Sequence, residues 1–241
     1  MDVPYNFMRL LHFLVFFVGL GLTILGAVPS DWAPAPIVVV SENVNVSVGP
    51  QMALVVGRYW YQYVAKLDDR VSQRIPIYYA TFVPKNVTAF RDLLEVSQVK
   101  LMLGERMFLP ESARILSDEE TGILQIAPKD AAIAWFVFQI PRDLARLRFD
   151  VVISHFQPHY HYEGKSIAAY WPWLPQLDPL RKDLELMDKD FVVTVEALPH
   201  VRLKAESINA HLESSSPERL IVHPTHGENI AAAVEVDGAT N

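Results

Sequence analysis

The sequence predicts an all-β domain, mainly an antiparallel β-sandwich that is Ig-like in general architecture, preceded by one N-terminal transmembrane helix and accompanied by one or two short helices. Three observations support this prediction. One long apolar segment occurs, near the N-terminus. Short β-branched or aromatic runs follow it, separated by turn residues at regular spacing. Only 10 of 241 residues are glycine, and no phosphate loop or nucleophile elbow occurs, which argues against a dinucleotide-binding fold.

The apolar segment, residues 10–28, contains no acid, lysine or arginine. A helix of this length is roughly 28 Å long, close to the thickness of a bilayer's hydrocarbon core, so residues 1–30 are expected to form a membrane anchor. The alternative is a cleaved signal peptide. The run exceeds the usual length of a signal core, and Val28 and Pro29 leave no small-x-small cleavage site. Tyr5 and Trp32 are expected at the two membrane interfaces.

Charges near the segment predict its orientation. Arg9 precedes the helix, and no lysine or arginine follows until Arg58, so the N-terminus is expected in the cytoplasm. The domain would then be periplasmic or otherwise extracytoplasmic, on a single-pass protein of the inner membrane. Small residues at Gly19, Thr23 and Ala27 share one helix face and predict close packing against another membrane helix.

The remainder divides into three parts. Residues 31–36 form a Pro-rich spacer, which holds the domain near the membrane surface. Residues 37–206 are expected to form the extracytoplasmic β-sandwich domain, and residues 207–241 a polar extended tail. The net charge of −7 argues against a nucleic-acid partner. The absence of cysteine excludes disulfides, thiolate metal sites and a cysteine nucleophile.

The first strands come directly after the spacer. Residues 37–40 and 44–48 are two β-branched runs, separated by Ser-Glu-Asn. Residues 52–66 form a long strand pattern that is apolar or aromatic on both faces, typical of a sandwich centre or a partner contact. Residues 131–140 are also apolar on both faces and are expected to form the central strand.

The other elements follow from shorter patterns. A short helix is expected within residues 86–96, and a second from Asp178, with Pro179 in its first turn. Gly104 and Glu105 are expected to close a hairpin. Further strands are expected at residues 75–83, 99–103, 106–109, 113–116, 123–127, 149–156, 191–197 and 200–205.

One segment has the residue types of a metal site. His155, Gln157, His159, His161 and Glu163 occupy alternate positions, so they would share one face of an extended chain. Imidazoles two residues apart with a nearby carboxylate suit Cu²⁺ or Zn²⁺. Pro158 and the aromatic neighbours argue against a regular ladder here. Any further ligand would have to come from elsewhere, with His200, His223 and His226 as the options.

A second segment is rich in aromatic and proline residues. Residues 170–175 read Tyr-Trp-Pro-Trp-Leu-Pro, a rigid apolar surface with a low entropy cost of ordering. Tyr170, Trp171 and Trp173 are therefore expected to dock on a partner subunit or on the membrane surface. The alternative is that the tryptophans cap the end of the core.

No pattern of catalytic residues stands out, so the expectation is a non-catalytic accessory or structural subunit of a larger membrane complex, respiratory or photosynthetic for instance. Its partners would be other membrane protein subunits and the lipid bilayer, and it would need no cofactor. The alternative is an extracytoplasmic copper- or zinc-binding or metal-delivery protein that uses the histidine segment. A hydrolase or glycan-binding enzyme on the sandwich has only the Tyr/Trp cluster in its favour.

Overall fold

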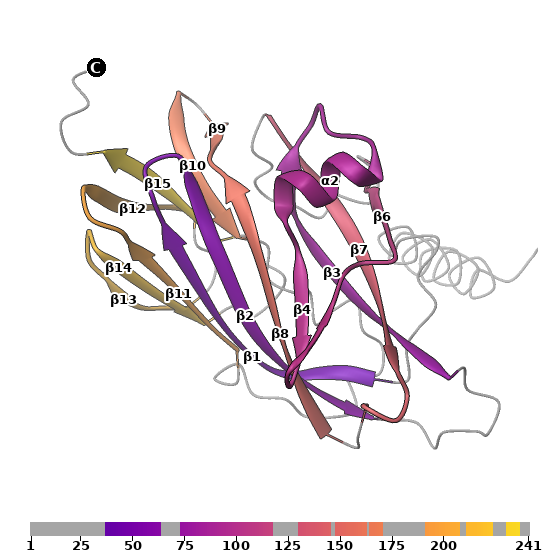
Figure 1. The fold of residues 1–241 in the computed structure, drawn as a ribbon. Coiled ribbons are helices and arrows are strands. Elements are labelled where there is room, and N and C mark those ends of the chain that lie inside the picture. The colour runs from indigo at the N-terminus through magenta and orange to yellow at the C-terminus, as the bar shows by residue number, and fades with distance from the viewer. Residues whose placement is uncertain are drawn as a thin grey trace, which may run out of the picture.

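The computed structural model describes residues 37–63, 73–117, 130–145, 148–162, 164–170, 191–207, 211–223 and 230–236. These residues are mostly β-strand, with one α-helix, which confirms the prediction of a mainly β domain (Figure 1). No helix in these ranges is long and apolar enough to cross a membrane. The predicted anchor at residues 1–30 and the spacer at residues 31–36 lie outside the described residues.

The largest sheet has eight strands in the order β13-β14-β11-β1-β2-β8-β4-β5. All of its neighbouring strands are antiparallel except β1 and β11, which are parallel. Its strands are β1 (Ile37–Val48), β2 (Met52–Tyr63), β4 (Lys100–Leu103), β5 (Arg106–Phe108), β8 (Arg148–Pro158), β11 (Phe191–Ala197), β13 (His211–Ser215) and β14 (Arg219–His223).

Two smaller antiparallel sheets pack against one face of the eight-stranded sheet. The three-stranded sheet has the order β3-β7-β6 and the four-stranded sheet the order β12-β15-β10-β9. The described strands therefore form three sheets, whereas an Ig-like sandwich would have two. The remaining elements are β3 (Arg74–Pro84), α2 (Phe90–Ser97), β6 (Ser112–Ile115), β7 (Ala131–Pro141), β9 (Tyr160–Tyr162), β10 (Lys165–Tyr170), β12 (Val201–Ser207) and β15 (Ile230–Val236).

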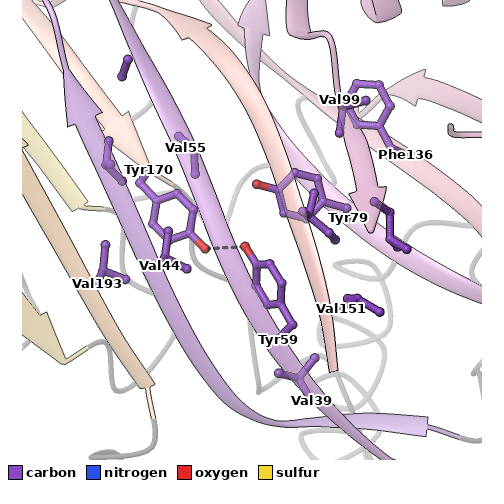
Figure 2. Close-up of a cluster of buried hydrophobic side chains, with 14 of the residues drawn as sticks. Val39, Val44, Val55, Tyr59, Tyr79, Val99, Phe136, Val151, Tyr170 and Val193 are labelled. Carbon is purple, nitrogen blue, oxygen red and sulfur yellow. Dashed lines mark hydrogen bonds between the residues drawn. The ribbon is translucent and has the colours of Figure 1, made fainter. Parts of the chain in front are cut away.

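The main hydrophobic core lies between these layers. On β2 the side chains of Val55, Tyr59 and Tyr61 point inward and are buried, as strand alternation requires. They meet buried residues of β3, β7 and β10 from the smaller sheets, including Tyr79, Phe136 and Tyr170 (Figure 2). Each such side chain contributes about 1.5–3 kcal/mol through removal from water. Packing between distant strands therefore holds the layers together.

A second core covers the opposite face of the smaller sheets. It includes Phe82, Trp135, Tyr160 and Ile167, all of them buried. Strand β7 thus has buried apolar side chains on both faces, and it lies between β3 and β6. The prediction that residues 131–140 form a central strand is confirmed.

Several local predictions are also confirmed. Helix α2 begins inside the predicted range and ends one residue beyond it, and its buried Leu93 packs on the core. The hairpin of β4 and β5 turns at Gly104 and Glu105, with Gly104 at φ 59°. Such a positive φ is a conformation that glycine adopts without strain.

Two predictions about chain organisation are wrong. The tail predicted for residues 207–241 contains β13, β14 and β15, and β15 lies between β10 and β12. Leu220, Val222 and Ala232 from these strands are fully buried. The predicted break in residues 41–43 is absent as well, since β1 is one strand with an irregularity between Val39 and Ser41. Glu42 is tolerated there because its carboxylate has a partner in the core, described below.

Gly57 on β2 leaves the space that the Tyr59 ring occupies. A Cβ added at Gly57 would lie 2.5 Å from two ring carbons of Tyr59. That ring is buried and held at its hydroxyl, so it has little room to move. We expect Gly57→Ala to lower the free energy of unfolding by at least about 1 kcal/mol, measured by chemical denaturation.

The control for this substitution is a double-mutant cycle. In a Tyr59→Leu background the smaller side chain should relieve the contact, and Gly57→Ala should then cost less. An equal cost in both backgrounds would show that the Tyr59 ring is not the cause.

Candidate functional site

A chain of buried hydroxyl groups joins the eight-stranded sheet to the four-stranded sheet. The Tyr170 hydroxyl donates a hydrogen bond to Glu42 Oε1 at 2.8 Å. Because a hydroxyl has one proton, the Tyr59 hydroxyl must donate to Tyr170, at 3.1 Å (Figure 2). Burial raises the pKa of both phenols well above the ordinary value, and the charge of Glu42 raises both pKa values further. These tyrosines therefore stay protonated at physiological pH.

A second buried polar group joins the eight-stranded sheet to the three-stranded sheet. Thr81 Oγ1 donates to Gln157 Oε1 at 3.2 Å, so it must accept from His155 Nε2, which is 2.7 Å away. The other ring nitrogen, Nδ1, then accepts from the Tyr79 hydroxyl at 3.0 Å. Gln157 also donates to the backbone carbonyl of Ala169 on β10.

This arrangement suits a neutral imidazole. Burial lowers the pKa of His155 to about 4, and the hydrogen bond with Gln157 offsets only part of that effect. All the residues of the two polar groups are almost completely removed from solvent. A substrate arriving from water would not reach them, so their role is to hold the layers together in one register.

The predicted metal-binding face is wrong for the described histidines. Strand β8 ends at Pro158 and β9 begins at Tyr160 in a different sheet, so the alternation of side chains is interrupted. His155 and Gln157 face the core, His159 lies in the link between strands, and His161 is exposed. Among the described residues no group of three potential metal ligands occurs. Glu163 lies outside them.

Two of the three histidines named as possible additional ligands, His200 and His223, are among the described residues. His223 Nε2 lies 2.8 Å from Glu213, and its Nδ1 lies 3.2 Å from the backbone carbonyl of Phe191. His200 is exposed in a turn, at φ 70°. His226 is not among the described residues. Among the described residues, neither His200 nor His223 therefore joins the His155 segment in a group of three potential metal ligands.

The predicted docking role is wrong for Tyr170. Its side chain belongs to β10 and is buried in the core, where it bonds to Glu42. It is therefore unavailable to a partner. Other predicted sites lie outside the described residues: the docking residues Trp171 and Trp173, the helix-packing residues Gly19, Thr23 and Ala27, and the interfacial residues Tyr5 and Trp32.

A pocket lies where the three sheets meet, and we refer to it as the junction pocket. Its volume is about 310 Å³. Strand ends and links position its lining: the end of β3, the start of β7, and the link between β8 and β9. The lining residues are Pro84, Lys85, Asn86, Asp130, Pro158, His159 and Tyr160.

Two polar side chains of the junction pocket have no hydrogen bond within the described part of the chain. They are the Tyr160 hydroxyl and the His159 imidazole, and the polar atoms of both are buried. Asp130 is held in place, because its Oδ1 accepts the backbone N–H of His161 at 2.8 Å and its Oδ2 lies 3.3 Å from His161 Nδ1. Buried polar atoms without partners are rare in folded proteins, which makes this pocket a candidate for a small-molecule site.

The outer face of the eight-stranded sheet carries a row of apolar and aromatic side chains. We define the β2–β8 outer surface as Met52, Leu54, Val56, Arg58 and Trp60 of β2 with Phe156 of β8. Phe156 is directly opposite Leu54 in the register, and Met52, Val56 and Phe156 are all exposed. The Arg58 guanidinium lies 5.2 Å from the Trp60 ring centroid, and its Nε donates to Asp150 at 2.7 Å.

No local sequence pattern points to the junction pocket or to the roles of Glu42 and Tyr160. The contacts of both residues come from strands far away in the sequence. The β2–β8 outer surface did leave a signal, since residues 52–66 are apolar on both faces. One face forms the core, and the other is the exposed surface.

Comparisons with known proteins leave the family open. No protein-family model and no curated protein matches the sequence. Among solved structures, leukotriene A4 hydrolase from Saccharomyces cerevisiae aligns with 91% of this chain at a TM-score of 0.41 and 8% identity. The yeast enzyme in complex with bestatin aligns with 88% at a TM-score of 0.38 and 9% identity. The chain spans about a third of each, 34% and 32%. Likeness at this level carries no argument about fold or function.

Proposed function

We propose that this chain is a non-catalytic accessory subunit of a larger membrane protein complex and that it docks on a partner subunit through the β2–β8 outer surface. The observation that carries the proposal is the exposed apolar row on β2 and β8. This row lies on the outer face of the eight-stranded sheet. The alternate residues of the same strands face inward and form the core.

The composition of this surface is that of a protein interface. Apolar side chains occupy its centre, where Val56 lies between Met52 and Arg58 along the strand. Trp60 and Arg58 are residue types enriched among interface residues that contribute most to binding. On the neighbouring strand β1, the residues opposite are polar, with Asn43 opposite Arg58 and Asn45 opposite Val56. An apolar centre with a polar rim is the usual anatomy of a docking site.

The sequence supports a membrane location for the partner. The apolar segment at residues 10–28 has the length of a membrane-spanning helix, and the short Pro-rich spacer would keep the domain beside the bilayer. The charge distribution around the segment favours an extracytoplasmic domain. The partner is therefore proposed to be a membrane protein with an apolar patch outside the membrane. We also propose that the domain is a β-sandwich in which the two smaller sheets face the one large sheet.

The proposal is tested by placing charge on the surface. We expect Val56→Asp with Phe156→Asp to reduce retention of the chain in its complex by at least tenfold, an effect of the order of 1.4 kcal/mol or more. The measurement is native electrophoresis of mild-detergent extracts from the cells that naturally make the protein. Both side chains are exposed, so the melting temperature of the purified variant should stay close to that of the wild type.

A matched control makes the same chemical change elsewhere. Leu109→Asp with Leu212→Asp also places two acids at exposed apolar positions, outside the β2–β8 outer surface. This variant should remain in the complex. The proposal fails if the wild type migrates alone, or if the Val56 and Phe156 variant is retained as well as the control.

A further inference from the structure

The junction pocket contains two side chains whose buried polar atoms have no hydrogen bond to any described residue. Tyr160 is only 1% exposed, and its ring packs against Phe82 with the ring centroids 6.0 Å apart. Its hydroxyl makes no hydrogen bond to any described residue. The same holds for both ring nitrogens of His159, although the Met52 backbone lies close enough to favour the protonated ring slightly. A buried hydroxyl without a hydrogen-bond partner costs free energy. A ligand that forms a hydrogen bond with it removes this cost, which favours binding.

The charges and hydrogen-bonding groups of the pocket determine which kind of ligand it favours. Lys85 and Asp130 contribute one positive and one negative charge to the lining. Burial raises the pKa of the Tyr160 phenol, and the nearby Asp130 carboxylate raises it further. Burial lowers the pKa of His159, which therefore offers one donor and one acceptor at neutral pH. An anionic group beside Tyr160 would be repelled by the Asp130 carboxylate.

From this geometry we propose that the junction pocket binds a small neutral molecule rich in hydroxyl groups, of the size of a monosaccharide or cyclitol. Each hydroxyl of such a ligand both donates and accepts, which matches the phenol of Tyr160 and the neutral imidazole of His159. The volume of about 310 Å³ is at the lower end of the range for small-molecule pockets. Pro84 and Pro158 supply apolar walls for the C–H face of the ring. None of its lining residues belongs to the β2–β8 outer surface, and the proposal does not depend on the docking proposal.

The test measures binding of two neutral probes, methyl α-D-glucopyranoside and myo-inositol, to the full chain by saturation-transfer NMR. The protein is purified in a detergent without a sugar headgroup, because maltoside detergents would compete. Binding with a millimolar Kd is expected for ligands this small, so titration extends to about 20 mM. Acetate and inorganic phosphate are titrated in parallel as anionic probes.

Tyr160→Phe removes only the unpartnered hydroxyl. It should weaken binding of the neutral probe at least about threefold, the value of one lost hydrogen bond. Without ligand, this variant should melt at the wild-type temperature or above it, because the hydroxyl has no hydrogen bond to a described residue. Tyr78→Phe is the matched control, since Tyr78 stacks on Trp135 and does not line the pocket, and it should bind like the wild type.

Each other outcome overturns the proposal. Tighter binding of acetate or phosphate than of both neutral probes would show that the pocket selects anions. Equal affinity of the wild type and Tyr160→Phe would place the probe elsewhere. A lower melting temperature of ligand-free Tyr160→Phe would show that the hydroxyl has a structural partner. An absence of binding by all four probes would show that the pocket is filled by solvent only.

Discussion

Deleting residues 230–241 is expected to abolish the cooperative fold of this domain. The deletion removes β15, which pairs with β10 on one side and with β12 on the other. Strand β12 would lose its partner strand, β10 would keep only β9, and Ala232 and Val234 would leave the main core. We expect a loss of more than about 4 kcal/mol, larger than the effect of most single substitutions. Circular dichroism during thermal unfolding should show no sharp transition for the truncated chain.

A shorter deletion provides the control. Removing residues 237–241 alone leaves every described strand complete, and this variant should unfold cooperatively near the wild-type temperature. If the longer deletion also melts like the wild type, β15 is not an essential part of the four-stranded sheet. The prediction of a polar extended tail would then be restored.

Acidification is expected to destabilise the domain through His155. Its pKa is about 4 in the folded protein and about 6.5 when exposed, so the unfolded chain binds a proton that the folded chain does not. Stability is therefore full above pH 6.5 and falls as the pH is lowered towards 4. At about 1.4 kcal/mol for each pKa unit, the loss from this residue approaches 3 kcal/mol at pH 4. Chemical denaturation at several pH values measures this slope.

The contribution of His155 is isolated by comparison with His155→Gln, because all other ionisable groups are common to both proteins. The variant should be less stable than the wild type at neutral pH, since Tyr79 and Thr81 lose a partner, and its stability should fall less steeply with acid. His200→Asn is the control at an exposed histidine, and its φ of 70° is tolerated by asparagine. Parallel curves for wild type and His155→Gln would contradict the assignment.

Local patterns in the sequence were sufficient to predict most of the strands. Residues 131–140 and 149–156 combine apolar or alternating side chains with β-branched and aromatic types, and both segments are strands in the structure. The hairpin at Gly104 and the short helix α2 also follow from nearby residues alone. In each case the signal lies within a few residues of the element that it predicts.

Predictions failed where the deciding partner is distant in the sequence. Glu42 indicated a break between two strands, because a carboxylate is unfavourable in a core unless it has a hydrogen-bond partner. Its partner is Tyr170, which is 128 residues away in the sequence. The alanine-rich run of β15 has little strand character of its own, yet it pairs with two strands and is buried. For His159 and His161 the alternation argument assumed one continuous strand, whereas the chain leaves the eight-stranded sheet at Pro158.

By itself, then, the sequence determined the β character of the domain, the places of most of its strands and the presence of one long apolar segment. Those properties depend on residue type and on spacing along the chain. Only the tertiary structure decided how the strands divide into three sheets and which face of β2 is exposed. It also decided that Tyr160 and His159 line one pocket, where their polar atoms have no hydrogen bond to any described residue. The reason is that sheet order and pocket lining are set by contacts between residues far apart in the chain, which no local pattern encodes.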